Sequence, residues 1–172
     1  EGAIINDYVR SEYNRHFDHV IELGNDPTIL PYVNHPQNIG HGEMKLLERG
    51  IDYIFKNVLN KSTTDYVFKL GARYTLNNNF SLQNYDKHKY TFRSHIDSFI
   101  KLPVVTTGLY SIPISRLEEF RKILIYGQNI LSNTCCIIEK LFLEMIPDKN
   151  INFIPTLGVE GMLSYNKTFF SV

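Results

Sequence analysis

Hydrophobic positions along the chain follow two different periods, and these divide it into helices and strands. Apolar residues three or four positions apart predict amphipathic helices, whereas short apolar runs that end at glycine or polar loops predict strands. Helices are expected over residues 3–17, 43–58, 116 onward and 134–146, and strands over 18–24, 65–70, 89–94, 104–112 and 151–154. The early alternation of helix and strand favours a parallel, Rossmann-like half, and the later elements predict a mixed sheet. We therefore expect one α/β domain over residues 1–172, with helices flanking the sheet.

Composition agrees with a folded domain and excludes some function classes. The chain has 172 residues, of which 43% are hydrophobic, enough for a sizeable core. Lys+Arg and Asp+Glu both number 18, so no net field attracts nucleic acid, and no nucleic-acid partner is expected. No apolar run reaches the roughly 18–20 residues that cross a bilayer, so no transmembrane segment is expected. No signal peptide is expected at the start of the chain. Because the chain begins at Glu1 and not at Met, we expect a trimmed domain or part of a longer protein.

The cysteines indicate a reducing environment. Cys135 and Cys136 are the only two, and they are adjacent, a spacing at which a disulfide ring is strained. With no disulfide framework, a cytoplasmic location is expected. Both thiols are interpreted as core residues at a buried helix start, not as a metal or catalytic site.

The segment Asp65–Tyr74 carries the clearest signal of a ligand site. It begins as a buried-looking strand and ends in Lys-Leu-Gly-Ala-Arg-Tyr. Ligands of open α/β sheets bind at the carboxyl ends of strands, and Lys69 and Arg73 there suit a phosphorylated or otherwise anionic ligand. The alternative is an ordinary strand end with solvated charges. Tyr74 is expected either to contact a sugar or base or to cover the core.

Two other segments carry candidate groups. Gly40, Gly42 and Glu43 lie in a loop that enters a helix, where backbone N–H groups bind anions; for Glu43, a hydroxyl-binding role or simple helix capping is the alternative. His41 between them is expected to be an exposed loop histidine. Arg93, His95 and Asp97 alternate along an extended segment and so share one face. His-x-Asp suits an acid/base pair or a metal, and a polar sheet edge is the alternative.

Three segments, in order, carry a resemblance. The first is 69–74, Lys-Leu-Gly-Ala-Arg-Tyr; the second is 38–47, beginning Asn-Ile-Gly-His-Gly-Glu; the third is 107–113, Thr-Gly-Leu-Tyr-Ser-Ile-Pro, followed by a helix and by Ile-Glu-Lys-Leu at 138–141. Together they resemble small bacterial and viral nucleotide-sugar-dependent glycosyltransferases of the GT-A type. Those enzymes carry a Lys-x-x-Gly-Arg-Tyr-like motif at the end of the central strand. Here Gly71 comes one position early, and Ala72 stands where the glycine would be.

The resemblance implies transfer of a sugar from a nucleotide-sugar donor to a glycan or other hydroxyl acceptor. It also implies a Rossmann-like GT-A sheet whose first strand would precede Glu1. The donor diphosphate would be bound by Lys69, Arg73, Tyr74, Gly40, Gly42 and Glu43. The acceptor side would comprise Thr106, Thr107, Gly108, Arg93 and His95. The general base would be Glu139 or Asp97, with Glu160 as a competing carboxylate.

The sequence departs from the family at the metal site. Lys69 and Arg73 occupy the region where the Asp-x-Asp motif would stand. Cationic side chains would then neutralise the leaving diphosphate, so no metal ligands are predicted, although Mn²⁺ or Mg²⁺ stays open as a cofactor. A non-catalytic α/β binding or interaction module on the same scaffold is the main alternative function. A hydrolase of nucleotides or phosphoesters would require a denser cluster of carboxylates or histidines.

Overall fold

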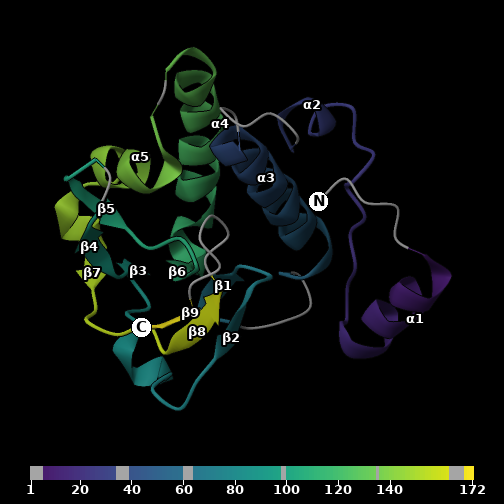
Figure 1. Ribbon diagram of the computed structural model, residues 1–172, viewed down its shortest axis with the longest axis horizontal. Coiled ribbons are helices and arrows are strands. Elements are labelled where there is room, and N and C mark those ends of the chain that lie inside the picture. Colours follow the sequence, from purple (N-terminus) through teal and green to yellow (C-terminus); the bar gives the residue numbers. More distant parts are fainter. Residues whose placement is uncertain (1–5, 34–38, 60–63, 98–99, 135, 163–168) are drawn as a thin grey trace. The chain divides into compact units, whose positions relative to one another are not determined.

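The chain divides into two compact units, one built from helices and one that contains the strands. The computed structural model describes residues 6–33, 39–59, 64–97, 100–134, 136–162 and 169–172. Contacts divide the chain into a helical unit, residues 1–60 and 124–136, and a sheet unit, residues 61–123 and 137–172 (Figure 1). The expectation of a single domain over residues 1–172 stays a prediction.

The helical unit contains α1 (Asp7–His16), α2 (Leu30–Val33), α3 (Ile39–Asn57) and the second part of α4 (Leu117–Asn133). The Asn6 side chain caps α1 by accepting from the Val9 amide at 2.9 Å. The expected strand over 18–24 is wrong, because residues 18–23 have no strand conformation and pair with none of the described strands. Instead, Glu22 in this segment binds the Arg10 guanidinium on α1 with both carboxylate oxygens.

The sheet unit has a four-stranded mixed sheet, which confirms the mixed α/β prediction. Its order is β1 (Tyr66–Leu70), β6 (Leu109–Pro113), β3 (Tyr90–Phe92) and β7 (Ile151–Phe153). β6 runs antiparallel to β1 and β3, and β3 is parallel to β7. The strand expected as central, β1, therefore lies at an edge of this sheet among the described residues.

Two smaller sheets and a helix complete the sheet unit. β4 (Ser94–Ile96) pairs with β5 (Pro103–Val105), and β8 (Val159–Met162) pairs with both β2 (Tyr74–Leu76) and β9 (Phe169–Ser171). The expected strand over 104–112 is thus two strands in two different sheets. α5 (Ile138–Met145) begins four residues later than predicted, and single 3₁₀ turns lie at 82–84, 114–116 and 148–150.

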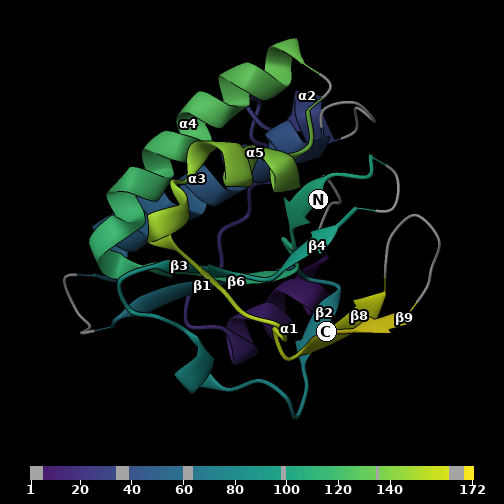
Figure 2. The same ribbon diagram turned by 90° about the vertical axis from the view of Figure 1, so that its left-hand side faces the viewer.

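Aromatic side chains form the core on one face of the four-stranded sheet. α5 and the start of α4 pack there, as Figure 2 shows for α5. Phe142 of α5 lies within 5.4–6.0 Å, between ring centroids, of three rings from β3, β6 and α4. All the rings are fully buried: Tyr90, Phe92, Tyr110, Phe120 and Phe142. This dense packing fixes α5 against the sheet, and so fixes the position of the residues in its first turn.

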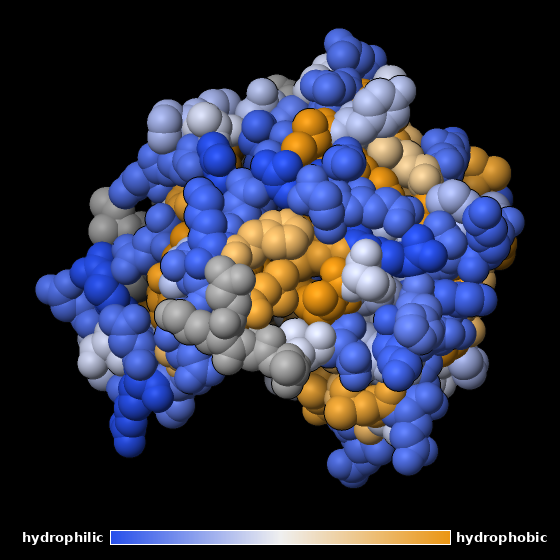
Figure 3. All heavy atoms as spheres, turned by 180° about the vertical axis from the view of Figure 1, so that it is seen from behind, coloured by the Kyte–Doolittle hydropathy of each residue, from blue (hydrophilic) through white to orange (hydrophobic). Residues whose placement is uncertain are grey.

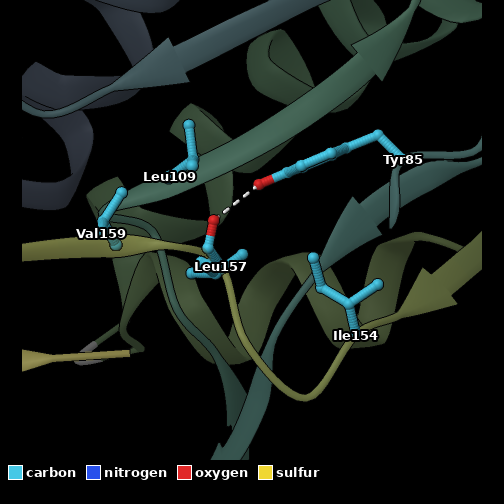
Figure 4. Packing of buried hydrophobic residues seen from close by; sticks show 5 residues of the cluster. All are labelled: Tyr85, Leu109, Ile154, Leu157 and Val159. Atoms are coloured by element: carbon cyan, nitrogen blue, oxygen red, sulfur yellow. Dashed lines mark hydrogen bonds between the residues drawn. The ribbon is translucent and has the colours of Figure 1, made fainter. Parts of the chain in front are cut away.

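A second hydrophobic cluster includes Leu109 of β6. Leu109 directly precedes Tyr110, so its side chain points to the opposite face of the sheet. Figure 4 shows the members of the cluster: Tyr85, Leu109, Ile154, Leu157 and Val159. The Tyr85 hydroxyl donates to the Leu157 carbonyl at 3.1 Å, and burial raises the pKa of Tyr85 to about 12. Gly158, the next residue, has φ of +75°, and the backbone of Phe80 occupies the space of a β-carbon there.

The surface is largely hydrophilic, with smaller apolar areas, on the face that Figure 3 shows. Among the described residues, no helix combines the length and the apolar character that crossing a membrane requires.

Candidate active site in the sheet unit

Most of the predicted site residues in the sheet unit meet at one short segment, Thr106–Gly108, which we call the threonine loop. It joins β5 to β6. The Lys69 ammonium donates to the Thr107 carbonyl at 2.7 Å, and the Thr107 hydroxyl donates to Glu139 Oε1 at 3.0 Å. One residue of the loop therefore connects a cation from β1 with a carboxylate from α5.

Lys69 is positioned by strand pairing. It lies opposite Tyr110 in the register of β1 with β6, and its side chain is half-buried. The ammonium lies 5.8 Å from the centroid of the Tyr110 ring, within the range of a cation–π contact. These contacts hold the cation at the carboxyl end of β1, where the sequence predicted it.

Glu139 is positioned by the first turn of α5. The helix begins at Ile138, which is buried, so the next side chain lies at the start of the helix, as predicted. Glu139 is half-buried, and its carboxylate accepts from the Thr107 hydroxyl. A hydrogen bond to one oxygen fixes the direction of the other, which is what a general base requires.

His95 of β4 also contacts the threonine loop, at Thr106 rather than at Thr107. Its Nδ1 lies 3.3 Å from the Thr106 hydroxyl, and the Thr106 amide donates to the Arg93 carbonyl at 2.8 Å. Partial burial and the Arg93 cation lower the pKa of His95, whereas the Asp97 carboxylate opposes that shift. Arg93 itself donates through Nε to the Pro155 carbonyl at 3.1 Å. The arrangement thus places a neutral imidazole beside the loop at pH 7.

Asp97 has a structural task at the end of β4. Its Oδ1 accepts from the Ile100 amide at 2.9 Å, and its carbonyl accepts from the Lys101 amide. Lys101 has φ of +56° at this turn. The hydrogen bonds in which Asp97 takes part close the β4–β5 hairpin, so Glu139 is the better general-base candidate of the two. The competing Glu160 lies in β8, where it pairs with Thr75 and Ser171.

Arg73 lies in the turn from β1 to β2, and Tyr74 is the first residue of β2. Arg73 is exposed, and its guanidinium lies 6.0 Å from the centroid of the Tyr74 ring. The Tyr74 amide donates to the Gly71 carbonyl at 3.0 Å and so closes the turn. The Gly71 amide donates to the Gly108 carbonyl at 2.9 Å, which joins the turn to the threonine loop. Both residues thus belong to the same neighbourhood as Lys69.

The remaining donor-side candidates lie in the helical unit. The prediction of a loop there is wrong, because α3 begins at Ile39 and includes Gly40, Gly42 and Glu43. The prediction of an exposed His41 is also wrong: its side chain is 4% exposed. It stacks on Tyr32 with ring centroids 3.8 Å apart.

His41 is held in one tautomer. Its Nδ1 lies 3.0 Å from the Ser132 hydroxyl, which itself donates to the Gln128 carbonyl at 2.8 Å. The hydroxyl proton is therefore used, so Nδ1 carries the proton and Nε2 is the bare nitrogen. Nε2 has no hydrogen-bond partner in the part of the chain that the structure describes. Burial, and next the charge of Lys45, lower the pKa of His41.

Neither a metal centre nor the predicted thiol core is formed by the described residues. In that part of the chain, no three His, Cys, Asp or Glu side chains gather where they could hold an ion. Cys136 is half-buried between α4 and α5, not at a helix start as predicted, and Cys135 lies outside the described residues.

Comparison with known proteins finds no matching family model, no matching curated protein and no matching solved structure.

Some parts of the site were not predicted. The sequence analysis placed Thr107 near an acceptor but did not connect it to Lys69 and Glu139. The only local signal was Thr-Thr-Gly after two buried valines, because polar residues and a glycine there end a strand.

Proposed function

We propose that this chain is a glycosyltransferase that moves a sugar from a nucleotide-sugar donor to a glycan or other hydroxyl acceptor. The observation that carries the proposal is the bridge from Lys69 through Thr107 to Glu139. A transferase needs a positive charge for the departing diphosphate and a carboxylate for the acceptor proton. Both group types lie within hydrogen-bond reach of one residue here.

The reaction assigns a separate task to each group. The acceptor oxygen bonds to the anomeric carbon as the bond from that carbon to the β-phosphate oxygen breaks. The bonding electrons leave with the nucleoside diphosphate, whose growing negative charge Lys69 and the exposed Arg73 stabilise. In the inverting form of the reaction, the acceptor proton passes to Glu139, which Thr107 orients. No step is drawn through a metal ion.

The GT-A assignment is part of the same proposal. It is supported by a mixed sheet with helices packed on one face, by cations at and after the carboxyl end of β1, and by a carboxylate in the first turn of a later helix. Gly40 and Gly42 lie in the first turn of α3, where N–H groups face outward along the helix axis, and Glu43 follows that turn. Their part in donor binding stays a prediction.

The test is a transfer assay with UDP-, GDP- and CMP-linked sugars, with and without Mn²⁺, on the unmodified chain and on Glu139→Gln. Glu139→Gln keeps the side-chain shape and an oxygen that accepts from Thr107, but it cannot take a proton. We expect transfer to fall on the order of 10²–10⁴-fold, as for loss of a general base, with nucleotide binding retained. Nucleotide binding without transfer in either protein would instead favour the non-catalytic binding module.

A further inference from the structure

Tyr74, the first residue of β2, has an aromatic ring that lies against three backbone positions, and all three are glycine. A β-carbon at Gly71 would lie 2.9 Å from ring atom Cδ2, one at Gly108 would lie 3.0 Å from Cε2, and one at Gly161 would lie 2.5 Å from Cδ1. These separations are shorter than van der Waals contact between carbon atoms, at about 3.5–4.0 Å. The ring therefore occupies space that any other residue at these positions would fill.

The three glycines come from separate segments of the sheet unit. Gly71 follows β1, Gly108 ends the threonine loop, and Gly161 lies in β8, opposite Tyr74 in the register of β2 with β8. Two of them contact one edge of the ring and the third contacts the other edge. The ring is thus held from both sides, and it joins the four-stranded sheet to the β2–β8 pairing.

The contact with Gly108 links the ring to the candidate site. Gly108 directly follows Thr107, and its carbonyl accepts from the Gly71 amide at 2.9 Å. The ring lies directly beside Gly108, so a shift of the ring toward it would displace the loop that holds the carbonyl bound by Lys69 and the hydroxyl bound to Glu139. Glycine has the most backbone freedom of any residue, so Gly108 needs an external constraint to keep one position.

We infer that Tyr74 is a positioning residue, whose ring fixes the threonine loop and thereby the separation of Lys69 from Glu139. The inference rests on the proposed function and deepens it. This role differs from both expectations for Tyr74, which were contact with a sugar or base and covering of the core. The ring carries this role through its close approach to the three glycines.

The experiment compares four variants with the unmodified chain: Tyr74→Phe, Tyr74→Leu, Gly108→Ala and the double variant Tyr74→Leu/Gly108→Ala. Tyr74→Phe keeps the ring and should stay within about threefold of the unmodified kcat. Tyr74→Leu removes the ring, and a misplacement of about 1 Å at a reacting centre costs on the order of 100-fold. We expect kcat to fall by at least tenfold with little change in the KM for the donor.

The double variant tests the contact itself. Gly108→Ala alone adds a β-carbon against the ring and should also lower kcat. With leucine at position 74 that clash is relieved, so the two effects should not multiply, and the double variant should be no slower than Tyr74→Leu. Multiplying effects would mean that ring and loop act independently, and this would overturn the inference.

Amide hydrogen exchange provides a readout that does not depend on transfer. The Gly71 amide is hydrogen-bonded to the Gly108 carbonyl. Measured against the amides of β3 and β6, its exchange rate should rise at least tenfold in Tyr74→Leu and should not change in Tyr74→Phe. Uniformly faster exchange throughout the sheet unit would show a purely structural role and overturn the inference. If the unmodified chain transfers no sugar, the proposed function fails. The positioning by Tyr74 is then still tested by amide exchange, because slow exchange at Gly71 that is lost in Tyr74→Leu and kept in Tyr74→Phe would support it.

Discussion

Replacing Thr107 with valine should separate catalysis from donor binding. Valine has nearly the shape of threonine and the same β-branching, so it suits the same backbone. It removes the hydroxyl that donates to Glu139 but leaves the Thr107 carbonyl, which is the group that accepts from Lys69. The substitution therefore breaks one arm of the bridge and keeps the other.

The size of the effect follows from the contact that is lost. A hydrogen bond to a charged group contributes about 1.5–3 kcal/mol. Glu139 is half-buried, so water partly replaces the lost donor, and the lower end of that range applies. Since about 1.4 kcal/mol is a tenfold change in rate, kcat should fall by roughly tenfold.

The assay measures steady-state transfer and, separately, the affinity for the nucleoside diphosphate by calorimetry. Thr107→Val should lower kcat while leaving diphosphate affinity within about twofold, because the bond from Lys69 to the backbone is retained. Thr107→Ser is the matched control, since it keeps the hydroxyl and should stay close to the unmodified chain. Equal activity of the valine and serine variants would refute the assignment of Thr107 as the residue that orients Glu139.

Three further predictions concern stability, each measured by urea denaturation. Phe142→Ala removes a fully buried ring and should lower the free energy of unfolding by about 3–5 kcal/mol; a loss below about 1 kcal/mol would contradict the packing described here. His41 has a lowered pKa, so its contribution is complete above the unfolded value of about 6.5 and decreases as the pH falls through that value. His41→Gln should therefore reduce the loss of stability between pH 7 and pH 5, and an unchanged pH dependence would argue against a buried neutral imidazole. Gly158→Ala should lower the free energy of unfolding by more than about 1 kcal/mol, because φ is positive there and the Phe80 backbone fills the space. Gly50→Ala is the matched control: it lies in open space within α3 and should raise the free energy of unfolding by about 0.5–1 kcal/mol. Similar effects of the two substitutions would refute this account.

Local patterns predicted the elements that carry the site. β1 and the helix that carries Glu139 were predicted because apolar residues there recur with a clear period, although α5 begins four residues later than the pattern indicated. The mixed sheet was also predicted. The break at Thr106–Gly108 was not, because Val-Val-Thr-Thr has continuous strand propensity; the chain leaves one sheet there and enters another, which is a matter of tertiary pairing.

Tertiary contacts also explain the errors around α3. Gly40 and Gly42 have low helix propensity, so the sequence predicted a loop, yet the helix begins before them. His41 is buried there by Tyr32 and by hydrogen bonding with Ser132, a residue 91 positions away in the sequence. No local pattern could reveal that partner.

The measurement that tests the central claim most directly is calorimetric titration with UDP, GDP and CMP, with and without Mn²⁺. It compares the unmodified chain with Lys69→Ala, Arg73→Ala and, as a control, Lys122→Ala, which removes an exposed cation from α4. The account predicts that at least one nucleotide binds, that binding weakens in both Lys69→Ala and Arg73→Ala, and that the control is unchanged. No binding, or binding that neither site variant alters, would contradict a diphosphate site at the end of β1.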